Sequence, residues 1–92
     1  MDKTNDEKQY YVYMLKCVDG TLYTGITNDP EKRLKCHNKG KASKYTRSRL
    51  PVKMVYKEEI KGKGKALTRE REIKKLPREN KLKLMETAIE RK

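Results

Sequence analysis

Apolar and polar residues alternate along two short segments near the start of the chain. Residues 10–16 and 21–27 are rich in Tyr, Val, Leu and Thr, and they flank the tripeptide Val18-Asp19-Gly20. An Asp-Gly pair between two such runs is a strong signal for a β-hairpin. The pattern therefore predicts two strands joined by a turn.

A helix and a third strand are expected next. Asp29 can accept the first free N–H groups of a helix, and Pro30 fits the first helical turn. We expect this helix to end near Gly40. A basic loop comes after it, which contains Tyr45, Thr46 and Arg47. Residues 52–60 alternate loosely between apolar and polar, and they predict the third strand.

The C-terminal third of the chain has helical spacing. Residues 61–65 are expected to form a flexible link, and Pro77 divides the remaining residues into two helical runs. The apolar positions at helical spacing are Ala66, Leu67, Ile73 and Leu76 in the first run, and Leu82, Met85 and Ile89 in the second. The order of elements, ββαβαα, predicts one α+β domain without internal repeats.

Length and composition limit the domain organisation. A chain of 92 residues leaves room for one compact unit. Residues 1–9 are polar and lack an apolar period, so we expect a short disordered leader there, a folded domain over residues 10–85 and the end of the last helix or a tail over residues 86–92. With 34% hydrophobic residues and neither Trp nor Phe, the core must be small and must use the six tyrosines.

Positive charge is concentrated after residue 30. The formal net charge is +12, yet residues 1–30 contain three lysines and five acidic residues, so residues 31–92 carry the whole excess. Residues 32–53 hold nine basic residues and no acidic one. Such a field is self-repelling unless a polyanion neutralises it, which makes nucleic acid a better candidate partner than a membrane surface.

No segment of about 18 apolar residues is present, and the first nine residues are too polar for a signal peptide. We expect a cytoplasmic protein without membrane attachment, and no feature calls for an obligate protein partner. Cys17 and Cys36 stand alone, so we expect reduced thiols and no structural zinc site or disulfide framework.

Three tyrosines have two alternative interpretations. Tyr11 and Tyr13 fall on one face of the first strand, and Tyr23 lies on the strand expected to pair with it. They either fill the core in place of Phe and Trp, since Tyr is a favoured strand residue, or Tyr13 and Tyr23 direct their phenol oxygens into a shared pocket on the sheet.

Arg33 and His37 are four residues apart, so they share a helical face with about 5–6 Å between their Cβ atoms. They belong either to a solvated face or to a site where both reach one phosphate. His37 is the only histidine in the chain, which keeps the second interpretation open.

Glu70 falls on the inward stripe of its helix, three residues after Leu67 and three before Ile73. A carboxylate at such a position needs a partner. That partner is either Arg33 or a lysine in a structural ion pair, or a divalent cation. Mg²⁺ accepts one or two carboxylates when water and substrate phosphate complete its shell.

These residues resemble the motifs of a known family. Tyr11-Val12-Tyr13, nine intervening residues and Tyr23-Thr24-Gly25 look like the paired tripeptide that names the GIY-YIG nuclease superfamily, and the likeness extends from residue 10 to about residue 85. Arg33 with His37, Tyr45, and Ala66-Leu67 ahead of Glu70 come in the family's order. The match extends to the small stand-alone bacterial members of the superfamily.

The chain also departs from the family pattern at three points. Position 11 is Tyr in place of Gly, and position 24 is Thr in place of Ile. An asparagine that some members carry after the glutamate has no clear counterpart, Asn80 being nearby.

The resemblance implies a three-stranded antiparallel sheet flanked by helices and a metal-dependent endonuclease, with a place in DNA repair or recombination. It implies that Tyr13 and Tyr23 are active-site tyrosines, that Arg33 binds the phosphate with His37 as an auxiliary, and that Glu70 holds a single Mg²⁺ or Mn²⁺ ion. A free phenol titrates near pH ~10, so Tyr13 could take a proton from water only if the surrounding cations ionise it.

DNA is favoured as the substrate and RNA is possible. The candidate nucleic-acid-binding residues are Lys16, Lys32, Arg33, Lys35, Lys44, Tyr45, Arg47 and Arg49. One alternative is a non-catalytic basic DNA- or RNA-binding module of the same fold, which leaves the inward Glu70 unexplained. Another is a basic protein of an RNA assembly such as a ribosome, which leaves both Glu70 and His37 unexplained.

Overall fold

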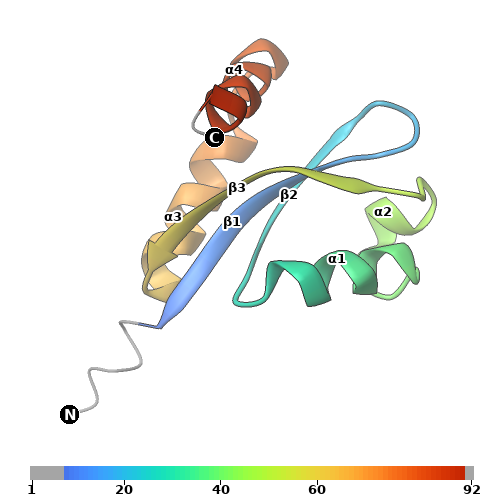
Figure 1. Cartoon of the computed structure of the whole chain (residues 1–92), viewed down its shortest axis with the longest axis horizontal. Coiled ribbons are helices and arrows are strands. Elements are labelled where there is room, and N and C mark those ends of the chain that lie inside the picture. The colour runs from blue at the N-terminus through green and yellow to red at the C-terminus, as the bar shows by residue number, and fades with distance from the viewer. Residues whose placement is uncertain (1–7, 91–92) are drawn as a thin grey trace.

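A computed structural model describes residues 8–90 of the chain, with side chains described up to residue 87. The elements in chain order are β1 (Gln9–Lys16), β2 (Leu22–Thr27), α1 (Pro30–Asn38), α2 (Lys44–Arg47), β3 (Lys53–Lys61), α3 (Lys63–Lys74) and α4 (Arg78–Glu90). The strands form one antiparallel sheet in the order β2-β1-β3, with α1 and α2 on one side and α3 and α4 on the other (Figure 1). The expected α+β fold, a three-stranded antiparallel sheet flanked by helices, is thereby confirmed.

One helix was not predicted from the sequence. Helix α2 contains Tyr45, Thr46 and Arg47, where the pattern indicated a loop. Four residues are too few to show a helical period. The helix begins where the Ser43 hydroxyl accepts a hydrogen bond from the backbone N–H of Thr46 at 3.3 Å. The observed order is therefore ββααβαα in place of ββαβαα.

The flexible link expected at residues 61–65 was also wrong. Lys61 ends β3 and Lys63 begins α3, so the connection is Gly62 alone. Its φ of 95° is a conformation that only glycine adopts without strain. A run of alternating Lys and Gly has no apolar period, which is why the start of this helix could not be recognised from the pattern.

The expected boundaries lie close to the ends of the described segment. Residues 1–7 of the expected leader and residues 91–92 of the expected tail lie outside the described residues, and Gln9 already belongs to β1. Helix α4 continues from residue 86 to residue 90. No helix in the described part of the chain is long and apolar enough to cross a membrane.

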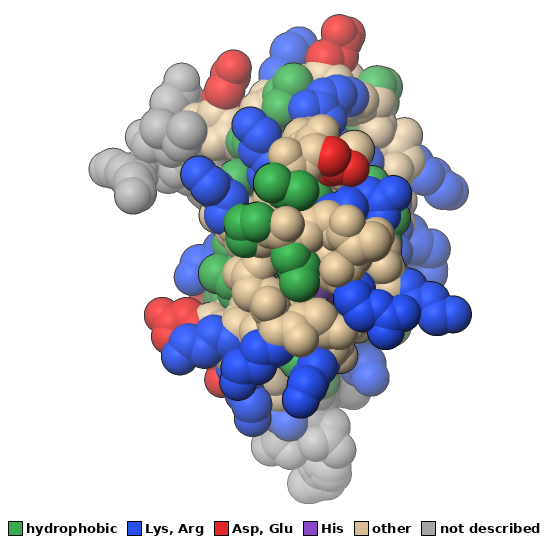
Figure 2. Space-filling model, turned by 90° about the vertical axis from the view of Figure 1, so that its right-hand side faces the viewer, with side chains coloured by type: hydrophobic (Ala, Val, Ile, Leu, Met, Phe, Trp, Pro, Cys, Tyr) green, Lys and Arg blue, Asp and Glu red, His purple; other side chains and the backbone are tan. Residues whose placement is uncertain are grey.

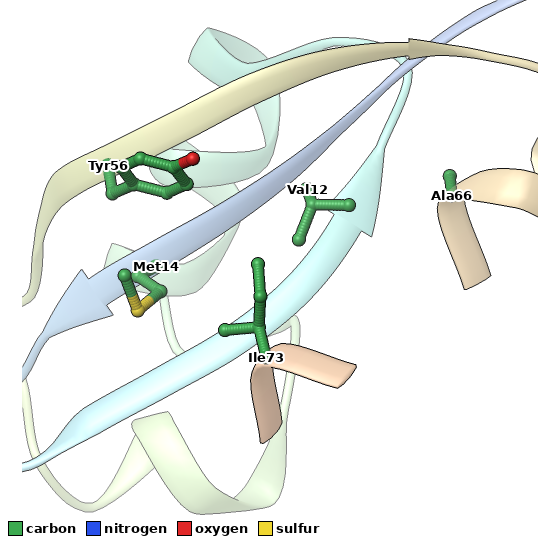
Figure 3. Packing of buried hydrophobic residues seen from close by; sticks show 5 residues of the cluster. All are labelled: Val12, Met14, Tyr56, Ala66 and Ile73. Atoms are coloured by element: carbon green, nitrogen blue, oxygen red, sulfur yellow. The ribbon is translucent and has the colours of Figure 1, made fainter. Parts of the chain in front are cut away.

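Strand β1 is central and buries side chains on both faces of the sheet. Val12 and Met14 pack with Ala66 and Ile73 on the α3 side (Figure 3). Since successive residues of a strand alternate between faces, Tyr13 lies on the opposite side, in a cluster to which α1 contributes. The strand therefore joins a mainly hydrophobic core on one face to a cluster that includes the buried His37 on the other.

Helix α1 is capped at its start and is held at its end by the segment that leads into β3. At its start the Asp29 side chain accepts a hydrogen bond from the Lys32 N–H at 3.2 Å, and Pro30 occupies the first turn, as expected from the sequence. At its end the Asn38 amide donates to the Val52 carbonyl at 3.0 Å and accepts from the Val52 N–H at 2.8 Å. These contacts hold the face of α1 that carries Arg33 and His37 against β1.

Candidate active site

Tyr13 extends across the neighbouring strand β2. The register of the two strands places Tyr13 opposite Gly25, and a Cβ added at Gly25 would lie 2.7 Å from the Tyr13 hydroxyl oxygen. Only a residue without a side chain leaves room for the phenol. The Tyr13 side chain is 1% exposed, so its hydroxyl needs a partner inside the protein.

His37 provides that partner and begins a buried chain of hydrogen bonds. Tyr13 Oη and His37 Nε2 are 2.9 Å apart, and His37 Nδ1 and Thr46 Oγ1 are also 2.9 Å apart. Thr46 Oγ1 donates in turn to the carbonyl of Ser43 at 3.4 Å. This pattern assigns the proton to His37 Nδ1 and leaves Nε2 to accept the Tyr13 hydroxyl proton.

Burial keeps both rings neutral. It lowers the pKa of His37 to about 4, with a further contribution from the positive charge of Arg33. Burial also raises the pKa of Tyr13, and the hydrogen bond and charge of Arg33 offset this only in part. In the free protein the loss of water around the phenol therefore outweighs the charge of Arg33, and ionisation of Tyr13 by these cations together with a bound metal stays a prediction.

Arg33 lies beside the Tyr13 hydroxyl. Their interaction is the largest cause of the raised pKa of Arg33. Arg33 Nε is buried and has no hydrogen-bond partner among the described residues. Leaving such a donor unpaired costs on the order of 1–3 kcal/mol, so structural pairing alone does not explain the position of the guanidinium. Its charge and donors are suited to an anion next to the phenol.

Tyr23 lies among the other rings. Its ring centroid is 6.5 Å from that of Tyr13, 5.3 Å from that of His37 and 6.1 Å from that of Tyr45. The residue is half-buried, whereas Tyr13 and His37 are fully enclosed. Tyr23 therefore connects the buried hydrogen-bond chain with the surface.

Glu70 acts on this cluster from the other side of the sheet. Helix α3 packs against both β1 and β2, and the negative charge of Glu70 contributes to the raised pKa of Tyr13. The Glu70 side chain is 16% exposed and forms an ion pair with Lys74, with 3.2 Å between Oε2 and Nζ. Of the partners for Glu70 that the sequence left open, the structure shows a lysine.

The described residues offer a metal ion few ligands. Among residues 8–87 there is no group of three or more His, Cys, Asp or Glu side chains arranged to hold a metal. Glu70 supplies one hard oxygen donor, so the donor set fits only an ion that takes most of its shell from water and phosphate, as Mg²⁺ does. Such an ion would have to displace the exposed ammonium of Lys74.

The expected nucleic-acid-binding residues lie on several elements. Those that are exposed are Lys16 on β1, Lys32 and Lys35 on α1, and Lys44, Tyr45 and Arg47 on α2. Lysine and arginine side chains surround a group of hydrophobic ones at the end of the molecule near α2 and the β1–β2 turn (Figure 2). The combination gives this end a positively charged surface.

Arg49 is already engaged within the protein. Its guanidinium pairs with Asp19 at 3.1 Å, donates to the Tyr45 carbonyl at 2.7 Å and lies 3.8 Å from the centre of the Tyr45 ring. Arg49 therefore holds Tyr45 in place, a different use from the phosphate contact expected from the sequence.

Three residues of the cluster were not recognised in the sequence. Gly25 was seen only as part of a tripeptide, although its lack of a side chain makes room for Tyr13. Lys74 is four residues after Glu70, a spacing that could have suggested the ion pair. Thr46 carries no comparable signal, because its contact with His37 depends on how the segment between α1 and α2 turns.

Comparison with known proteins agrees with the fold and the motifs. A family model described as the GIY-YIG catalytic domain matches residues 9–83. A UPF0213 protein of Clostridium perfringens is 57% identical over 75 residues, which are 82% of this chain and 81% of that protein. A UPF0213 protein of Staphylococcus saprophyticus is 51% identical over 77 residues, 84% of this chain and 94% of the relative.

Two solution NMR structures are similar as well. One, of a UPF0213 protein from Bacillus halodurans, is 42% identical with a TM-score of 0.56 and covers 86% of this chain and 84% of its own. The other, of a protein from E. faecalis, is 39% identical with a TM-score of 0.59, and the match covers 90% of this chain and 88% of that one. Both span nearly the whole domain.

Proposed function

Because this chain belongs to the GIY-YIG family, we propose that it is a divalent-metal-dependent endonuclease that binds nucleic acid, DNA in preference to RNA, and hydrolyses its phosphodiester bonds. The observation that carries the proposal is the convergence of Tyr13 from β1, Arg33 and His37 from α1 and the charge of Glu70 from α3. Arg33, His37 and Glu70 all influence the hydroxyl of Tyr13, and the four residues come from three elements that are separated along the chain.

Arg33 is the proposed phosphate-binding residue. Its planar guanidinium can donate to two non-bridging oxygens at once, and these donors gain strength as charge develops on phosphorus. Its position beside the Tyr13 hydroxyl would bring a bound phosphate next to the phenol.

Tyr13 is the proposed base. Tyr13 Oη would accept a proton from the attacking water while its own proton moves to His37 Nε2, 2.9 Å away. The transfer is uphill in the free protein, because burial raises the pKa of Tyr13 and lowers that of His37. We therefore place it in concert with attack on phosphorus. Tyr23, between these groups and the surface, would orient the phosphate.

Glu70 is the proposed ligand of a single Mg²⁺ or Mn²⁺ ion. When bound, such an ion stabilises negative charge on the leaving 3′ oxygen. Lys74 would release Glu70 at that point, and its side chain, which is 53% exposed, has room to do so.

The substitution Glu70→Gln tests the proposal. It keeps the shape of the side chain and removes the charge, so cleavage with Mg²⁺ or Mn²⁺ should fall by at least about 100-fold, since metal stabilisation of the transition state is worth several kcal/mol. Binding in chelator should persist or tighten, because a carboxylate repels a phosphodiester. Flapped, nicked, single-stranded and duplex DNA, together with RNA, are the substrates.

Glu72→Gln is the matched control, because Glu72 is on the same helix, its side chain is 59% exposed and its partner is Arg69. It should cleave at the wild-type rate. A Glu70→Gln variant that retains the full rate would remove Glu70 from the site.

A non-catalytic nucleic-acid-binding module of the same fold is the second candidate. The Glu70–Lys74 ion pair favours it, because the pair gives Glu70 a structural partner without any metal. In that case wild-type protein would bind these substrates and cleave none of them with either metal.

A further inference from the structure

A small groove opens beside β2 at the edge of the candidate active site. Its volume is about 260 Å³, below the roughly 300–1,000 Å³ of sites for drug-sized ligands. The groove is lined by Leu22, Tyr23, Thr24, Tyr45, Lys74 and Lys81. Its size suits one planar ring system better than an extended ligand.

Two aromatic rings border the groove. The rings of Tyr23 and Tyr45 are nearly parallel, with 22° between their planes and 6.1 Å between their centroids. Tyr45 is 37% exposed, which is high for so large an apolar ring. Its position is nevertheless set by Arg49, whose guanidinium lies 3.8 Å from the ring centre. Tyr45 is therefore a preorganised surface ring, and the hydrophobic core does not need it.

The charged residues of the groove select the kind of ligand. Lys74 and Lys81 are among the lining residues and no carboxylate is, although Lys74 pairs with the neighbouring Glu70 at 3.2 Å. A larger hollow of about 760 Å³, formed by residues of β1 and β3, includes Glu58 and Glu59 and is unfavourable for a polyanion. Aromatic faces next to positive charges suit a ligand that joins a flat base to a phosphate.

From these observations we propose that the groove binds an unpaired nucleobase next to the phosphate to be cut, so that the substrate class is nucleic acid with a single-stranded segment. In a duplex both faces of each base are covered by its neighbours, so no base is free to enter the groove beside these rings. Of the groove residues, Tyr23 packs its ring against His37 with 5.3 Å between the centroids, and Lys74 pairs with Glu70, so the occupant of the groove would lie beside the reacting groups. This inference rests on the proposed function.

Binding of fluorescein-labelled oligothymidylate and of a hairpin duplex with the same number of phosphates tests it, by fluorescence anisotropy in chelator. Wild-type protein should prefer the single strand. Tyr45→Leu keeps apolar volume but removes the ring, and it should weaken single-strand binding by about 5- to 150-fold, the range for loss of one stacked base. Duplex binding should fall much less, so that the ratio of single-strand to duplex affinity drops. Tyr45→Phe keeps the ring and should behave as wild type.

The ratio of single-strand to duplex affinity is the readout, because partial unfolding of a variant lowers both affinities alike. Equal affinity of the wild type for both ligands, or an unchanged ratio in Tyr45→Leu, would overturn the inference. If wild-type protein cleaves nucleic acid but shows no preference for single strands, the inference about the groove is overturned and the nuclease proposal stands. Single-strand preference without cleavage supports the groove and removes the nuclease proposal.

Discussion

His37 is neutral because the protein encloses its side chain and gives each ring nitrogen a hydrogen-bond partner. Its side chain is fully buried, and both ring nitrogens are within hydrogen-bond distance of a hydroxyl oxygen. Protonation would place a charge where Arg33 already lies nearby, and this opposes the imidazolium form as well. The only histidine of the chain therefore makes folding sensitive to pH.

Acidification should destabilise the protein between pH 6.5 and about 4. The unfolded chain takes up a proton on His37 near pH 6.5, and the folded protein does so only near pH 4. The contribution of neutral His37 to the free energy of unfolding is therefore fully present above about pH 6.5 and is lost as the pH falls toward 4. A pKa difference of about 2.5 corresponds to roughly 3 kcal/mol. Urea unfolding at pH 7 and pH 4 measures the free energy of unfolding. Wild-type protein should lose about 3 kcal/mol more than His37→Gln, and equal losses would contradict this account.

The elements differ in how far the sequence reveals them. The strands and α1 could be predicted within one or two residues, because period-two alternation, the Asp-Gly turn and the Asp29 cap are local signals. Helix α2 could not, since it has four residues and its main role is a contact between Thr46 and His37 across the fold. The site divides in the same way: spacing placed Arg33 and His37 on one face, whereas no spacing connects either of them with Tyr13.

Two glycines in different elements should respond in opposite directions to replacement by alanine. In β2, the new Cβ of Gly25→Ala would meet the Tyr13 hydroxyl at 2.7 Å, and overpacking should cost about 1–3 kcal/mol. In α3, the Cβ of Gly64→Ala meets nothing within 4 Å, and the helix should gain roughly 0.5–1 kcal/mol. Urea unfolding at pH 7 measures both.

Gly25→Ala should also separate Tyr13 from His37, which a change in the ¹⁵N shift of His37 Nε2 would report. If Gly25→Ala is as stable as the wild type and this shift is unchanged, the close approach of Tyr13 is not the reason for glycine at this position.

The two faces of the sheet bury different kinds of residue. On the α3 and α4 side the buried residues are mainly hydrophobic, while on the α1 and α2 side they include the hydrogen-bonded pair His37 and Thr46. The surface is divided as well, since the positive charge is concentrated after residue 30 and surrounds the end of the molecule near α2 (Figure 2). The α3 and α4 side of the sheet therefore contributes mainly to stability, and the end of the molecule near α2 is suited to contact a ligand.

Nucleic-acid binding should depend steeply on salt. Log affinity is expected to fall against log salt with a slope of about −0.9 for each phosphate neutralised on B-DNA. Lys32→Gln removes one exposed charge on α1, close to Arg33, and should reduce the slope by about 0.9. Lys57→Gln is the control. Lys57 is exposed on β3, the edge strand opposite β2, and its replacement should leave the slope unchanged. Affinity that is constant from low to high salt would speak against a nucleic-acid partner.

The meeting of Tyr13 with Gly25 ties the candidate active site to the alignment of the hairpin. A slip of β2 by one residue would set Thr24 or Ile26 opposite Tyr13 and turn every side chain of the strand to the other face. The phenol would then collide with a side chain and lose His37, so a misaligned hairpin cannot assemble the cluster. A residue gained or lost in the turn between β1 and β2 would shift this alignment, because the length of the turn keeps the two strands in register.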